Sequence, residues 1–141
     1  MKTHIVYSAS TRVIRELPEV TSLLMPYGGV SLSTASKRPE VLPDDADVLV
    51  VIPDSMQSST NGWLWYLFGR QTATDGVVIA YDPYWTSFMT PLPGATVYAT
   101  NLVGLREVVR LLAEVYKTSS TEKREMMMAQ LIAAYGVKNG D

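Results

Sequence analysis

The feature of this sequence that most constrains its fold is a series of short apolar runs, each ended by polar residues. Residues 47–52 read Asp-Val-Leu-Val-Val-Ile and are followed by a proline and Asp54. Residues 76–81 read Gly-Val-Val-Ile-Ala-Tyr and are followed by Asp82. Continuous apolar runs of this length, rich in β-branched residues, are typical of strands that are buried on both faces. The sequence therefore predicts a parallel sheet with both faces covered.

Weaker signals extend this sheet and place helices between its strands. Residues 12–25 are predicted to be helical, with an interruption at Pro18, where a new helical turn begins. A second helix is predicted over residues 61–71, because apolar side chains recur there at helical spacing. The further strands are predicted at residues 3–8, 30–32 and 96–99.

Two consecutive helices are predicted near the C-terminal end. The first follows Asn101, a favoured N-cap residue, and the second begins in a capping-box pattern that runs from Ser119 to Glu122. Gly136 is predicted to end the second helix. The apolar stripes are Leu105, Val108, Val109, Leu112 and Tyr116 in the first helix, and Met128, Leu131, Ile132 and Tyr135 in the second.

Strands that alternate with helices favour right-handed crossovers, and hence a parallel sheet with helices on both faces. The predicted fold is α/β: a single doubly wound domain over residues 1–141, with about five parallel strands in the order 2-1-3-4-5. A length of 141 residues is that of one ordinary domain.

Composition excludes several classes of function. The chain has no cysteine, which excludes disulfides, thiolate metal sites and cysteine nucleophiles, and its single histidine is His4. The net charge of −2 argues against binding to nucleic acid through a basic surface. No apolar run is long enough to span a membrane, and the first residues carry no signal sequence. We therefore expect a cytoplasmic protein that binds neither membranes nor nucleic acid.

Polar residues gather where the predicted strands end. In a doubly wound sheet, ligands bind at the carboxyl ends of the strands, where the strand order reverses. Hydroxyls, carboxylates, an arginine and aromatic rings at one edge suit a nucleoside or nucleotide. The residues predicted at this edge are Ser8, Ser10, Thr11 and Arg12 after the first strand, Asp54, Ser55 and Asn61 after the third, and Asp82, Tyr84 and Trp85 after the fourth.

These residues divide by the part of a nucleotide that each would bind. If the site also catalyses a reaction, we expect it at an N-glycosidic bond, with Asp54 or Asp82 as general acid or base. No resident metal is expected, although two aspartates facing one cleft could also hold a divalent ion. The expected contacts are phosphate with Ser8, Ser10 and Arg12, ribose with Asp54, and the base with Asp82 and Tyr84 or Trp85.

Each of these residues also has a structural interpretation. Residues 8–11 could form a turn and a helix cap, and Asp54 and Asp82 could be turn residues beside prolines. His4 is expected to be a buried histidine with satisfied hydrogen bonds. Of the consecutive methionines 126–128, at least one should be exposed; a partner surface is one interpretation of these residues, and the filling of gaps in packing is the other.

Residues 47–81 resemble the nucleoside 2-deoxyribosyltransferase-like proteins in layout: a strand, Asp54, a polar loop to Asn61, a helix and a further strand. The resemblance implies nucleoside binding and chemistry at the N-glycosidic bond. That family places an acidic nucleophile in this helix, where our register puts Tyr66. No acidic residue occurs anywhere in residues 55–74, so the transferase step itself is not expected.

Residues 5–11, Ile-Val-Tyr-Ser-Ala-Ser-Thr, resemble the opening strand and phosphate loop of flavodoxin-like flavin proteins. This second resemblance implies an FMN cofactor and electron transfer, with Trp63, Tyr84 and Trp85 beside the isoalloxazine ring. The family's loop normally contains a glycine where the backbone approaches the phosphate, and residues 8–12 contain none.

A third hypothesis is a non-enzymatic interaction or inhibitor protein, similar to small accessory proteins of phages and mobile elements. Residues 41–105 contain six aspartates against one basic residue, Arg70, so this part of the chain could meet a basic partner. The methionine-rich last helix could form an interface between copies of the chain or with another protein. Such a protein would not need to bind a small molecule.

Overall fold

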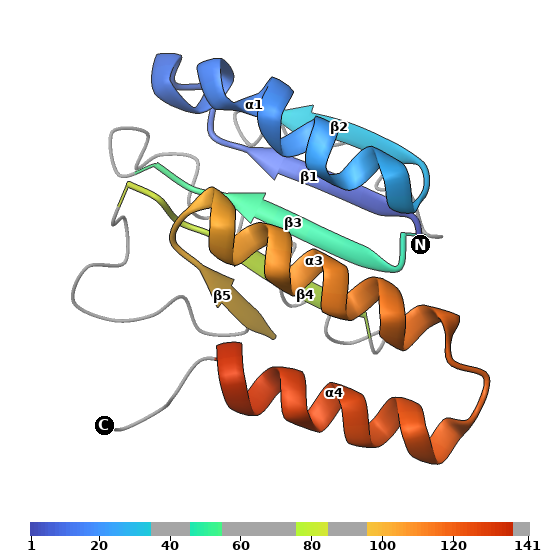
Figure 1. The fold of residues 1–141 in the computed structure, drawn as a ribbon. Coiled ribbons are helices and arrows are strands. Elements are labelled where there is room, and N and C mark those ends of the chain that lie inside the picture. The colour runs from blue at the N-terminus through green and yellow to red at the C-terminus, as the bar shows by residue number, and fades with distance from the viewer. Residues whose placement is uncertain (35–45, 55–75, 85–95, 137–141) are drawn as a thin grey trace.

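The computed structural model of this protein describes residues 1–34, 46–54, 76–84 and 96–136. Within these residues the chain forms one five-stranded sheet in the order β2-β1-β3-β4-β5, and every pair of neighbouring strands is parallel (Figure 1). The predicted fold class and strand order are confirmed. The strands are β1 (Thr3–Tyr7), β2 (Val30–Thr34), β3 (Val48–Ile52), β4 (Val77–Tyr81) and β5 (Val97–Ala99).

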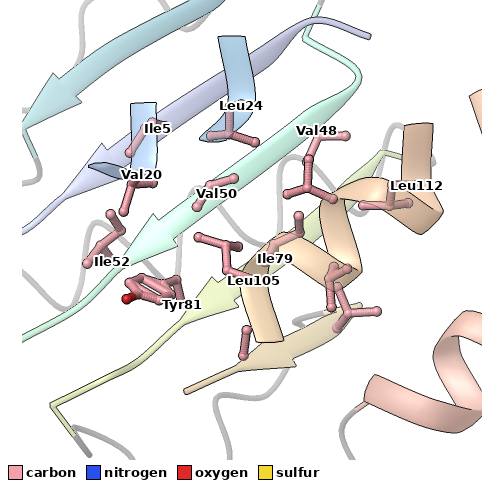
Figure 2. Packing of buried hydrophobic residues seen from close by; sticks show 14 of the residues in the cluster. Ile5, Val20, Leu24, Val48, Val50, Ile52, Ile79, Tyr81, Leu105 and Leu112 are labelled. Carbon is pink, nitrogen blue, oxygen red and sulfur yellow. The ribbon is translucent and has the colours of Figure 1, made fainter. Parts of the chain in front are cut away.

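The register aligns large apolar side chains across the sheet. Ile5, Val50, Ile79 and Val97 are register partners from β1 to β5, and each has an exposed fraction of 0%. Figure 2 shows their layer packed beneath side chains from two helices. Burying a side chain of this size contributes about 1.5–3 kcal/mol. This layer therefore contributes substantially to the stability of the strands whose carboxyl ends carry the polar residues.

Two helices, α1 (Thr11–Leu24) and α3 (Leu102–Lys117), cover this face of the sheet, and a 3-10 turn, η1 (Met25–Tyr27), follows α1 (Figure 1). The predicted apolar stripe of α3 is confirmed, since four of its members are fully buried and Tyr116 packs against the core. Helix α1 continues through Pro18, where an interruption was predicted. Pro18 and Ile14 are both exposed, so the Ile14 carbonyl that lacks its helical donor can bond water.

The opposite face of the sheet also carries buried apolar side chains. Val6, Val51 and Val78 each lie next to a residue of the first layer along their strand and so point to the opposite face, and each has an exposed fraction of 0%. The helix predicted over residues 61–71 lies outside the described residues, so helices are described on one face only. None of the helices in the described part of the chain is both long enough and apolar enough to cross a membrane.

The last helix, α4 (Thr121–Tyr135), lies at the β5 rim of the molecule and packs against α3 and β5 (Figure 1). Its N-cap is Ser120, whose Oγ accepts from the Lys123 N–H, so the capping-box prediction began one residue too early. Gly136 ends the helix as predicted. In the predicted apolar stripe only Leu131 is fully buried, and Ile132 is 43% exposed.

Candidate functional site

The carboxyl ends of β1 and β3 lie side by side, and we call this part of the sheet, with the residues that follow the two strands, the polar edge. Strand order reverses between these two strands, which is where ligands bind in doubly wound sheets. The Ser8 N–H donates to the Ile52 carbonyl at 2.9 Å, and the Ser8 Oγ accepts from the Asp54 N–H at 3.2 Å. These bonds extend the β1–β3 pairing by a residue and fix Asp54 beside the start of α1.

Ser10 joins the start of α1 to Asp54. Its Oγ accepts from the Val13 N–H at 3.3 Å, which makes Ser10 the N-cap of the helix, and donates to Asp54 Oδ2 at 2.7 Å. The helix-cap interpretation is therefore confirmed for Ser10. Thr11, the first residue of α1, is exposed. A single buried hydroxyl thus couples the helix terminus to the carboxylate at the end of β3.

Arg12 completes this network by forming a bidentate ion pair with Asp54. Its Nε donates to Asp54 Oδ2 at 2.6 Å and its Nη2 to Asp54 Oδ1 at 2.5 Å. The hydrogen bonds to Asp54 raise the pKa of Arg12 above its usual value. The Asp54 side chain has an exposed fraction of 0%, whereas that of Arg12 is 44% exposed. Bidentate pairing fixes the plane of the guanidinium as well as its position.

Two tyrosines and Glu16 lie beneath this arginine. The Arg12 guanidinium carbon is 4.3 Å from the centroid of the Tyr84 ring, a cation–π contact. The Tyr84 hydroxyl is 2.6 Å from Glu16 Oε2 and 2.9 Å from the Arg12 carbonyl oxygen, and the Tyr81 hydroxyl donates to Glu16 Oε1. Burial, followed by the hydrogen bonds to Glu16, raises the pKa of both tyrosines. Both phenols therefore remain protonated donors at neutral pH.

Asp82 is held on the β4–β5 side of the same edge. Its N–H donates to the Ala99 carbonyl at 2.8 Å, and its Oδ2 accepts from the Tyr98 hydroxyl at 2.6 Å. Its side chain has an exposed fraction of 0%. Asp54 and Asp82 thus both follow buried strands at the same edge, as predicted, and the charges of both contribute to the raised pKa of Arg12.

His4 lies within β1 and not at the carboxyl edge. Its Nδ1 is 2.6 Å from the Ser31 Oγ and its Nε2 is 2.8 Å from the Ser33 Oγ, so both ring nitrogens bond to β2. Burial lowers the pKa of His4 below its usual value. The prediction of a buried histidine with satisfied hydrogen bonds is confirmed.

Sequence reasoning missed Glu16 and Tyr81 as members of the cluster. The available signal was spacing, because Glu16 follows Arg12 by four residues and so shares its face of a helix. Three predicted site residues, Ser55, Asn61 and Trp85, lie outside the described residues. No group of three His, Cys, Asp or Glu side chains that could hold a metal ion occurs within the described ranges.

A hollow of about 540 Å³ lies elsewhere, between α1 and the beginning of α3. Its lining on α1 begins at Pro18 and includes Glu19, and it continues to Tyr27 and Arg106. Arg12, Asp54 and Tyr84 do not line it. The cluster formed by Arg12, Asp54 and Tyr84 and this hollow are therefore separate features.

No protein-family model matches the chain, and a comparison with curated proteins finds no match.

Proposed function

We propose that this protein binds a nucleoside or nucleoside monophosphate at the β1–β3 edge, with Arg12 as the principal contact. The observation that carries the proposal is the anchoring of a 44% exposed guanidinium by a fully buried carboxylate at the point where strand order reverses. Holding an arginine in a fixed plane costs conformational entropy before any ligand binds. A ligand that contacts the guanidinium in this fixed plane then binds with a smaller loss of entropy.

The remaining donors of Arg12 match oxygen acceptors on a sugar or phosphate. Asp54 engages Nε and Nη2, and Nη1 has no hydrogen-bond partner among the described residues. The Tyr84 ring covers one face of the guanidinium, so the other face could stack on a base. In this proposal Ser8, Ser10 and Asp54 act as positioning residues, whereas the sequence had suggested direct contacts with the ligand.

Local charge favours a ligand of low charge. The Asp54 carboxylate balances the Arg12 guanidinium, and Glu16 adds a second carboxylate beneath Tyr84. This edge carries more negative than positive charge, and its repulsion of a ligand grows with the negative charge of that ligand, so a nucleoside or its monophosphate is favoured over a triphosphate. Such small molecules also fit the cytoplasmic location that the sequence predicts.

The proposal concerns binding and assigns no catalytic step. A general acid or base must reach the bond that it acts on, within hydrogen-bond distance or through one water. The side chains of Asp54 and Asp82 both have an exposed fraction of 0% and are held by hydrogen bonds. Cleavage of an N-glycosidic bond by either aspartate would require this edge to open first.

The first test is mass analysis of small molecules released when freshly purified protein is heat-denatured. Isothermal titration with adenosine, AMP and ATP then measures affinity directly, with AMP or adenosine expected to bind more tightly than ATP. Arg12→Ala should weaken binding by roughly tenfold or more, because charge-assisted hydrogen bonds are lost. Arg110→Ala is the matched control, since Arg110 forms an exposed ion pair with Glu107 on α3.

Equal affinities of the wild type and the Arg12→Ala variant would contradict the role of Arg12. A preference for ATP would contradict the charge argument while leaving the location of the site intact. A yellow protein that releases FMN would favour the flavin hypothesis instead.

A further inference from the structure

The hollow between α1 and α3, which we call the α1–α3 hollow, has an apolar floor that the core holds in place. Its volume of about 540 Å³ is within the range of pockets that bind small molecules. Leu23, Tyr27 and Leu102 line it, and all three are half-buried and packed against the core. The floor is therefore formed before any ligand binds.

The rim of the hollow carries two opposite charges, which come from different helices. Glu19 belongs to α1 and Arg106 to α3, and both line the hollow and are exposed. They form no ion pair with each other, and neither forms a hydrogen bond or an ion pair with any other described residue. One turn further along α3, by contrast, Arg110 is paired with Glu107. The rim thus offers a carboxylate and a guanidinium that are both available to a ligand above one apolar floor.

Rigid backbone also lines the α1–α3 hollow. Pro18 within α1 and Pro26 in η1 are both part of the lining, and the proline ring fixes φ at each position. The end of η1 is held as well, because the Met1 ammonium donates to the Tyr27 carbonyl at 3.1 Å. Walls that are already ordered lose less entropy when a ligand binds between them.

The charges on the rim select the chemistry of the ligand. A ligand that complements the hollow has an ammonium for Glu19, a carboxylate for Arg106 and an apolar group for the floor. A free amino acid carries all three groups on one carbon atom. An anion such as a fatty acid or a phosphate is repelled by Glu19, and a simple amine is repelled by Arg106.

We propose that the α1–α3 hollow binds a free amino acid with a large apolar side chain, its ammonium at Glu19 and its carboxylate at Arg106. Water and salt screen both contacts because both side chains are exposed, so we expect a dissociation constant that is roughly millimolar. The proposal is independent of nucleoside binding, since Arg12, Asp54 and Tyr84 do not line this hollow.

The first experiment is an NMR titration of the ¹⁵N-labelled full chain with L-phenylalanine. Amide signals of residues 22–27 and 102–106 should shift to saturation, whereas those at the polar edge should not. Two analogues keep the ring and lose one charge: 2-phenylethylamine has no carboxylate, and 3-phenylpropanoate has no ammonium. Each should bind more weakly than phenylalanine by roughly two- to fivefold, as for the loss of one exposed ion pair. Equal affinities for the three compounds would overturn the proposal.

The second experiment assigns each charge to its residue by repeating the titrations with two variants. Arg106→Gln should remove the preference for phenylalanine over 2-phenylethylamine, because no cation remains to bind the carboxylate, and should keep the preference over 3-phenylpropanoate. Glu19→Gln should do the reverse. Both side chains are exposed, so neither substitution is expected to disturb the fold.

Arg15→Gln on α1 and Glu114→Gln on α3 are the matched controls, because both residues are exposed and neither lines the hollow. Both variants should keep both preferences. Arg12→Ala should bind phenylalanine as the wild type does, which separates this site from the nucleoside site. The proposal is overturned if phenylalanine causes no saturable shift up to its solubility limit, or if Arg106→Gln and Glu19→Gln keep both preferences.

Discussion

At the scale of single residues, Asp54 joins Ser8, Ser10 and Arg12 at the carboxyl edge. Its carboxylate accepts from Ser10 and Arg12, and its N–H donates to Ser8. Asp54→Asn removes the charge and turns one acceptor into a donor that faces other donors. We expect the free energy of unfolding to fall by about 2 kcal/mol, as for loss of buried hydrogen bonds to a charged group.

Urea unfolding of the Asp54→Asn variant measures this change. Glu107→Gln is its control, because Glu107 forms an exposed ion pair with Arg110 and such pairs contribute little. Equal stability of the wild type and the Asp54→Asn variant would mean that the Ser10–Asp54–Arg12 network does not hold the edge together.

The sequence allowed individual site residues to be predicted only in part. Ser10 was identifiable as a helix cap, because serine is favoured there whatever its other partners are. The pairing of Arg12 with Asp54 joins residues 42 apart in the chain, and no local pattern indicates such a contact. Glu16 was missed because a carboxylate on a helix is usually solvated, and only the position of β4 brings Tyr81 to it.

At the scale of elements, the turn after η1 depends on the backbone of one glycine. Gly28 has a φ of 145°, a conformation that side chains rarely allow. A Cβ added there would lie 2.0 Å from the Met1 carbonyl oxygen, while one added at Gly29 would meet nothing within 4 Å. We expect Gly28→Ala to lower the free energy of unfolding by about 2 kcal/mol, because strain and a clash coincide.

Gly29→Ala is the natural control for this substitution, since the two glycines are neighbours but Gly28 alone of the two combines a positive φ with a crowded Cβ position. Thermal unfolding followed by circular dichroism compares both variants with the wild type. A Gly28→Ala variant as stable as Gly29→Ala would show that the chain before β1 moves aside at little cost.

Elements were more predictable than contacts, for a physical reason. The strands and α3 bury most of their apolar side chains, so their burial pattern is visible as periodicity in the sequence. Helix α4 buries only Leu131 completely, and its predicted stripe correspondingly included the exposed Ile132. Its N-terminus was misplaced by one residue because Ser119 and Ser120 are equally good caps, and only the backbone decides between them.

At the scale of the whole molecule, the predicted strand order placed β2 at the edge beside β1, but it did not indicate which side chains hold β2 there. Among the described strands, β2 pairs only with β1, and its middle residue Leu32 is 46% exposed. Its side-chain bonds to the sheet include those from Ser31 and Ser33 to His4. No local pattern indicates that these serines bond to the only histidine of the chain.

This arrangement makes stability depend on pH through His4. Burial lowers the pKa of His4 in the folded protein, whereas the unfolded chain has the ordinary value of about 6.5. Below about pH 6.5 the unfolded state therefore binds more protons than the native state, and acidification favours unfolding. The stabilisation from neutral His4 is present above that pH and is lost as the pH falls through the lowered native pKa. Urea unfolding from pH 7.5 downwards should show this decline, and His4→Gln should remove its contribution.

The native pKa of His4 can be measured without ambiguity, because a chain with one histidine gives one imidazole signal in NMR titration. We expect the signal to titrate below the pH range of an unfolded peptide. An imidazole that titrates at or above the unfolded value would reverse the sign of the linkage, since acidification would then favour the folded state. In that case the bonds to Ser31 and Ser33 would stabilise the charged ring, and β2 would be held more firmly in acid than at neutral pH.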